Sequence, residues 1–136
     1  MKRKAFEKQR ARCKRHFDWW IARLGLGTWS IDVLYQQARD YRREHDVSTN
    51  SAMITYVDWR YLDAAIYVNI ARVKRMSDDE LERAVVHELC HLLVHELRES
   101  CGREDARDHE ERVVSHLAKA FQWVRRGSKR AEEEKV

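Results

Sequence analysis

Proline is absent from the 136 residues of this chain, and glycine occurs only four times. Because these two residues mark most sharp turns, the sequence offers few of them, and the strongest signals lie at Gly25, Gly27, Gly102 and Gly127. The three cysteines form no CxxC pair, and an odd number of them favours reduced thiols over a disulfide framework. No internal repeat or low-complexity block interrupts the chain.

Long apolar runs are also missing. No stretch reaches the roughly 18 apolar residues of a membrane span, and the basic N-terminus lacks the apolar core of a signal peptide. We therefore expect a cytoplasmic protein that makes no contact with membranes. With 43% hydrophobic residues, the chain can form one core but is too short for a second lobe, which predicts a single domain over residues 1–136.

Hydrophobic periodicity divides the first half of the chain into one helix and three strands. Apolar residues at helical spacing predict an amphipathic helix with a basic outer face at about residues 4–24. Alternating or β-rich segments predict strands at residues 29–35, 52–59 and 64–70. Residues 36–51 are polar, and we expect them to be partly helix and partly loop.

A second helix follows the third predicted strand. Ser77 and Glu80 have the spacing of a capping box, and Met76 and Leu81 stand at the two positions of a hydrophobic staple. These signals predict a helix that starts at about Asp78.

The last predicted helix carries apolar residues at helical spacing from Val113 to Val124. It follows a connection around residues 98–108 and precedes a charged C-terminal tail at about residues 127–136. The order α-β-β-β-α-α predicts an α+β domain, in which a small sheet of three or more strands packs on the helix that starts near Asp78.

That helix contains the most informative motif of the chain, the HExxH sequence at residues 87–91. His87 and His91 are one turn apart and share a helix face, so both imidazoles can reach one metal ion. Glu88 is rotated to the side where a water molecule activated by the ion would lie. Apolar residues cover most of the remaining circumference, and polar side chains on such a helix need a partner, which a bound Zn²⁺ ion would supply.

A catalytic zinc site needs a third protein ligand, which must come from the chain after His91. The candidates are Glu110, Glu111 and His109, near the start of the last helix. Periodicity alone favours Glu110, because it lies nearer the centre of the apolar face. His95 shares the polar stripe of the motif, but about 12 Å of helix separate it from the first histidine, which places it at the rim of the site.

The spacing between the motif and Glu111 resembles the gluzincin arrangement, in which a Glu on a second helix completes a His/His/Glu zinc site. The chain is similar in particular to the ImmA/IrrE-type peptidases and minigluzincins of phages and prokaryotes, whose order of elements matches residues 29–124. The positions after Glu111 that fit the ImmA/IrrE-type pattern are Val114, Ser115, Leu117 and Ala118. The resemblance implies a zincin-like fold and a zinc site formed by His87, His91 and Glu111.

Two alternatives for the third ligand stay open. Asp108 could cap the last helix, with Glu111 as the acid of its capping box rather than as a metal ligand. SprT-like zincins instead use a downstream histidine, and His109 imitates that pattern, although the glycine that typically follows is absent.

With these residues the chain is expected to be a zinc metalloendopeptidase. Glu88 would act as the general base on a metal-activated water and pass the proton to the leaving amine. The strand at residues 64–70 directly precedes the motif helix, so the zincin resemblance makes it the expected edge for an extended peptide substrate. Tyr67, His95 and His109 are the candidates for stabilising the oxyanion.

Charge adds a second class of function. The first fifteen residues contain eight Lys or Arg and a single acid, Glu7, and the net charge of the chain is +4. A basic helix could bind nucleic acid, although the acidic residues 132–134 argue against a dedicated DNA clamp. The alternatives to a peptidase are therefore a zinc-stabilised non-catalytic binding module and a basic nucleic-acid-associated protein.

Overall fold

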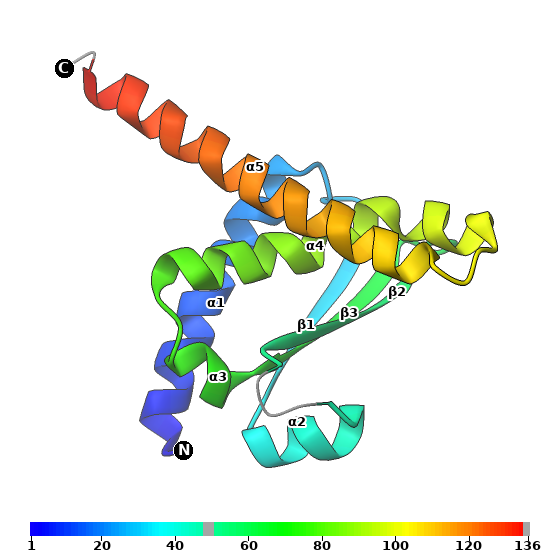
Figure 1. Ribbon diagram of the computed structural model, residues 1–136. Helices are drawn as coiled ribbons and strands as arrows, with labels where there is room; N and C mark the ends of the chain where they lie inside the picture. The colour runs from blue at the N-terminus through cyan, green and yellow to red at the C-terminus, as the bar shows by residue number, and fades with distance from the viewer. Residues whose placement is uncertain (48–50, 135–136) are drawn as a thin grey trace.

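The computed structural model describes residues 1–47 and 51–134. Over these residues the protein is α+β, with five helices and a three-stranded mixed sheet (Figure 1), which confirms the α+β part of the prediction. The elements are α1 Arg3–Arg23, β1 Ser30–Gln36, α2 Ala38–His45, β2 Met53–Asp58, β3 Asp63–Asn69, α3 Ile70–Lys74, α4 Asp78–Cys101 and α5 Ala106–Glu134.

The sheet has the strand order β1-β3-β2, so β3 lies in its centre. β3 pairs in parallel with β1 and antiparallel with β2. The prediction that residues 64–70 form an open edge is therefore wrong, because both sides of that strand are occupied. A short turn joins β2 to β3 and makes them neighbours, whereas hydrophobic alternation shows only which face each side chain takes. Among the described residues β2 pairs with β3 alone and forms one edge of the sheet.

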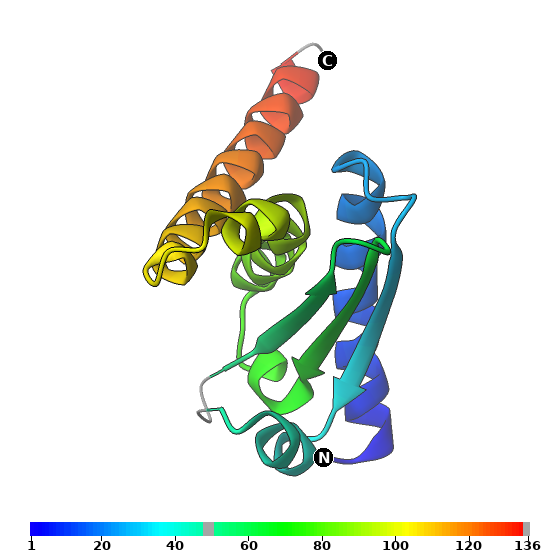
Figure 2. The same cartoon turned by 90° about the vertical axis from the view of Figure 1, so that its right-hand side faces the viewer.

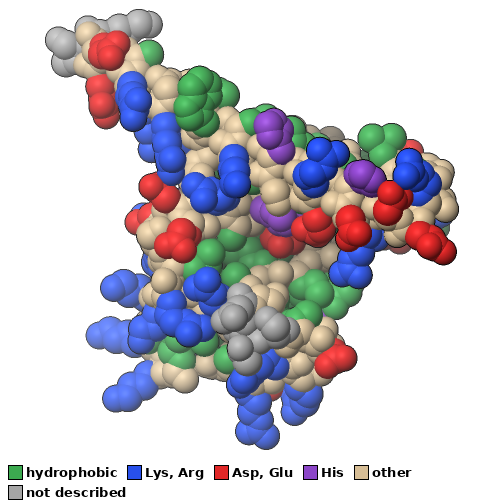
Figure 3. Space-filling model, in the orientation of Figure 1, with side chains coloured by type: hydrophobic (Ala, Val, Ile, Leu, Met, Phe, Trp, Pro, Cys, Tyr) green, Lys and Arg blue, Asp and Glu red, His purple; other side chains and the backbone are tan. Residues whose placement is uncertain are grey.

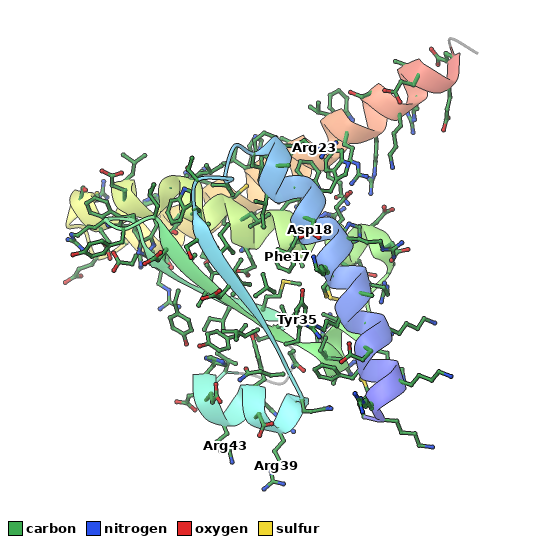
Figure 4. All side chains as sticks on the ribbon, turned by 180° about the vertical axis from the view of Figure 1, so that it is seen from behind. Phe17, Asp18, Arg23, Tyr35, Arg39 and Arg43 are labelled. Carbon is green, nitrogen blue, oxygen red and sulfur yellow. The ribbon has the colours of Figure 1, made fainter. Side chains whose placement is uncertain are left out.

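The core lies on one face of the sheet, between the strands and the helices α1 and α4. Alternation along β3 buries Ala64, Ile66 and Val68 on this face, as the sequence predicts. Figure 4 shows Phe17 of α1 and Tyr35 of β1 between that helix and the sheet. The core residues contributed by α4 and α5 are Leu81, Val85, Val86, Leu89, Cys90, Leu92, Val114 and Ala118.

The other face of the sheet is covered in part by α2. Tyr41 of this helix is fully buried, and His45 packs on the rings of Tyr56 and Tyr67 at centroid distances of 5.7 and 4.4 Å. Arg39 and Arg43, on the outer side of α2, point away from the sheet (Figure 4). Tyr67 therefore lies on the face opposite the core and α4.

The helix α4 starts at Asp78 with the predicted capping box. The Ser77 hydroxyl accepts a hydrogen bond from the Glu80 backbone N–H at 3.2 Å, and the Glu80 carboxylate accepts one from the Ser77 backbone N–H at 3.3 Å. The helix ends at Gly102, whose φ of 68° lies in the left-handed region that glycine adopts without strain. The connection to α5 is therefore only residues 102–105, shorter than the predicted 98–108.

The helix α5 packs along α4 and then continues past the body of the molecule (Figures 1 and 2). It extends to Glu134, so residues 127–134 of the predicted charged tail are helical. Residues 135–136 lie outside the described residues. Lys, Arg, Glu and Ala are good helix formers, but a helix that buries no face gives no hydrophobic period to detect. Among the described helices, none is long and apolar enough to cross a membrane.

Candidate metal centre

The HExxH residues lie on the side of α4 that faces the edge strand β2 and the start of α5. His87, Glu88 and His91 offer nitrogen and oxygen atoms that lie within 4.8 Å of one another. The two imidazole rings are 5.1 Å apart at their centroids. The spacing of one helical turn thus brings both rings to one place, as the sequence predicts.

Glu111 reaches the same place from α5. Its Oε2 lies 3.2 Å from His87 Nε2, and its Oε1 lies 3.2 Å from His91 Nε2. Ligands bound to zinc at 2.0–2.1 Å in a tetrahedral arrangement are separated by about 3.3 Å, close to both of these distances. A donor set of two imidazole nitrogens and one carboxylate therefore fits a Zn²⁺ ion in chemistry and in spacing.

Glu110 occupies a different position from its neighbour Glu111. Its side chain is buried, and Oε1 lies 2.8 Å from His91 Nδ1, on the opposite side of the imidazole from Nε2. Its Oε2 lies 2.9 Å from Arg98 Nε. The burial that periodicity indicates for Glu110 is present, but it places the carboxylate behind His91. His109 is half exposed and pairs with Asp105 at 3.1 Å.

Glu88 is held by a hydroxyl group from β2. The Thr55 hydroxyl donates a hydrogen bond of 2.5 Å to Glu88 Oε2. Burial raises the pKa of the Glu88 carboxyl to about 7, and the Thr55 hydrogen bond and the charge of His91 oppose this effect only in part. The pKa of His87 is lowered by burial and by His91. Neutral imidazole, favoured by this shift, is the form that binds metals.

A cleft leads to these residues between β2, α4 and the start of α5. Figure 3 shows it as a hollow below α5, with histidine and acidic side chains along the upper rim and apolar side chains beneath. A second hollow shares His87 and Glu88 with the cleft and is lined also by Ala52, Met76 and Arg83 among others. Residues of the HExxH motif therefore border two adjoining hollows.

Two residues beside the site escape prediction from the sequence. Thr55 is an ordinary strand residue, and no motif signals its bond to Glu88. Ser115 Oγ lies 3.4 Å from His87 Nδ1; its place one turn after Glu111 was noted only as part of a family pattern.

The three candidates for oxyanion stabilisation do not share one location. His95 lines the cleft, with Nδ1 3.6 Å from Glu110 Oε1, in agreement with a place at the rim. Tyr67 lies on the other face of the sheet, against His45, so this suggestion is wrong: alternation along β3 gives the side chain a face but does not tell which face looks toward α4. His109 lines a separate hollow between the end of α4 and the start of α5.

Comparisons of this chain with models of protein families, with curated proteins and with solved structures find no match.

Proposed function

We propose that this protein is a zinc-dependent metalloendopeptidase with a zincin-like fold and a gluzincin type of site. The observation that carries the proposal is the convergence of His87, His91 and Glu111 from two helices, with the carboxylate of Glu88 beside them. A structural zinc site has no need of a carboxylate that does not bind the metal, whereas hydrolysis requires a base at this position.

In this proposal the Nε2 atoms of His87 and His91 and the carboxylate of Glu111 hold Zn²⁺. When bound, the ion lowers the pKa of a coordinated water and polarises a carbonyl group. Burial and the neighbouring His91 lower the pKa of His87, which favours the neutral imidazole that a metal ion binds.

Glu88 serves as the general base and then as the acid. Its Oε2 accepts the hydrogen bond of Thr55, which leaves Oε1 to take a proton from the attacking water and to give it to the leaving amine. A pKa raised toward neutrality suits a group that must both accept and donate a proton near pH 7.

The edge strand β2 is the proposed binding site for the substrate. Among the described residues its outer backbone groups have no strand partner, so an extended peptide can add beside it and lie along the cleft. Because Glu88 borders two adjoining hollows, there is room for chain on both sides of a scissile bond. This arrangement supports cleavage inside an unfolded segment rather than at a chain end.

The test measures metal content and cleavage together. The purified protein should contain one Zn²⁺ per chain and should cleave a fluorophore-labelled unfolded protein such as denatured casein. Glu88→Gln should keep the zinc and reduce cleavage by about 10²- to 10⁴-fold, because it removes the base and not a ligand. His87→Ala should lose both.

Three outcomes would contradict the proposal. A wild-type protein without stoichiometric metal, and equally stable as His87→Ala, would exclude a zinc site. A Glu88→Gln variant as active as the wild type would exclude the assigned base. Zinc binding without cleavage of any unfolded substrate would favour a non-catalytic binding module instead.

A further inference from the structure

The structure assigns different tasks to the two adjacent acids at the start of α5. We infer that Glu110 is a positioning residue, which orients the imidazole of His91 toward the metal, while Glu111 is the ligand. The inference rests on the proposed zinc site. It concerns an acid that periodicity alone would select as the ligand itself.

The contact between Glu110 and His91 fixes the orientation of the ring. Glu110 Oε1 lies 2.8 Å from His91 Nδ1. A carboxylate accepts hydrogen bonds, and the contact at Nδ1 is the one with hydrogen-bond geometry, so it favours the tautomer with the hydrogen on Nδ1 and a lone pair on Nε2. That lone pair belongs to the atom that lies 3.2 Å from Glu111. Glu110 therefore selects the tautomer that a metal at Nε2 requires.

Glu110 is itself held in place from α4. Its side chain is only 5% exposed, and Arg98 Nε lies 2.9 Å from Oε2. Arg98 follows His91 by two helical turns, so it lies on the same side of α4 as the ring that Glu110 contacts. A buried carboxylate without partners is costly, and this pair of contacts keeps both oxygens of Glu110 occupied behind the ring.

The same geometry shows why Glu110 does not compete for the ion. Consecutive residues on a helix point about 100° apart, and here Glu110 approaches Nδ1 of His91 while Glu111 approaches the Nε2 atoms of both histidines. The side chain of Glu111 is 51% exposed and lies at the open cleft. On the other histidine, His87 Nδ1 is approached only by the neutral hydroxyl of Ser115, at 3.4 Å, among the described contacts. The effect of Glu110 should therefore fall on His91.

Zinc affinity tests the inference without any substrate. Glu110→Gln keeps the size and one acceptor of the side chain but removes its charge. Affinity measured by competition with a chelator should fall about 10- to 100-fold, the usual effect of removing such a partner of a metal-binding histidine. Glu82→Gln is the matched control, since Glu82 and Glu110 are each 7% exposed as whole residues and Glu82 lies at the other end of α4. Its zinc affinity should stay within twofold of the wild type.

A magnetic resonance measurement gives a second readout, whose first part needs only the wild-type protein. In the zinc-loaded wild type, the proton on His91 Nδ1 should be observable and protected from exchange, because it is bonded to a buried carboxylate. Glu110→Gln should move its resonance upfield, since a neutral acceptor forms a weaker hydrogen bond. Glu82→Gln should leave the resonance unchanged.

The outcomes separate this inference from the proposed function. Unchanged affinity in Glu110→Gln, an equal loss in Glu82→Gln, or a His91 Nδ1 that carries no protected proton would each overturn the positioning role while the wild type still binds zinc. A wild-type protein that binds no zinc would instead refute the metal site, and the inference with it.

Discussion

A buried acid lies at each end of α4, among histidine and arginine side chains. The two clusters differ in whether the residues bound to the acid still present a polar atom to the cleft. Glu82, in the second turn, and Glu110, packed on the C-terminal half from α5, are each 7% exposed. Both clusters contain histidine and arginine, and the geometry of the contacts shows how they differ.

Around Glu82 every contact ends on the one carboxylate. Trp20 Nε1 donates to Oε2 at 3.1 Å, Gln122 Nε2 donates to Oε1 at 3.2 Å, and Arg125 forms an ion pair with it. His16 lies 3.8 Å away. These partners come from α1 and α5, so the cluster joins three helices. Its hydrogen-bonding capacity is used inside the protein, which indicates a structural role.

Around Glu110 the contacts lead on toward the cleft. The carboxylate binds one nitrogen of His91, and the other nitrogen of the same ring faces Glu111 and the open cleft. A histidine has two nitrogens, so it can be fixed through one and still offer the other to a ligand. The comparison teaches that a buried acid indicates function when the group it binds still presents an atom to solvent.

The largest expected effect is a loss of folding stability when the cluster around Glu82 is disrupted. Glu82→Gln removes the charge that partners Arg125, and breaking one side of a buried ion pair costs about 3 kcal/mol or more. Urea unfolding in the presence of EDTA measures this loss. Glu110→Gln should lose less under the same conditions, because Arg98 is 31% exposed and can turn to water. Equal losses would show that both clusters serve stability alike.

The second largest expected effect is a gain of folding stability when zinc is added, and it tests the residues around His91. Zinc at about 100 times its dissociation constant should stabilise the folded protein by about 2.7 kcal/mol, because it binds the native state alone. Urea unfolding with and without zinc should show this gain in the wild type and in Glu82→Gln. His91→Ala should show none. A gain of the same size in His91→Ala would place the bound zinc elsewhere.

The sequence predicts the helices and strands of this fold better than it predicts which of them lie side by side. The capping box at Ser77 and the alternation along β3 are local signals, and both correspond to the structure. The order of strands depends on hairpin pairing and on packing against α4, so the sequence could not show that β2 rather than β3 forms the edge. The five-residue helix α3 is too short to give a period, and it was not predicted.

The residues of the candidate site also fall into two groups: those that local spacing predicts and those that only tertiary packing brings together. His87 and His91 come together because one helix carries both, and this the sequence shows through spacing alone. Thr55, Glu110 and Glu111 reach the site from other elements. Their positions depend on the rotation of α5 about its axis and on which face of β2 meets α4. A helical wheel detects that Glu110 is buried, but it does not tell which atom of His91 it meets.

The smallest expected effect is a change of folding stability with pH that arises from His16, in the cluster around Glu82. Burial lowers the pKa of His16 from its usual 6.5, and this outweighs the opposing charges of Glu82 and Asp78. Above about pH 6.5 neither the folded nor the unfolded chain protonates this ring, so its contribution is constant. As the pH falls below 6.5, the unfolded chain binds the proton first, and stability is lost until the pH reaches the lower folded pKa.

His16→Gln should remove this part of the pH dependence. The difference in unfolding free energy between wild type and variant, measured with EDTA at pH 8 and pH 5, should shift in favour of the variant at the lower pH. A shift in favour of the wild type would mean that Glu82 stabilises the charged ring more than burial opposes it. The cluster at Glu82 would then hold a second ion pair, and only the open cleft would distinguish the cluster at Glu110 from it.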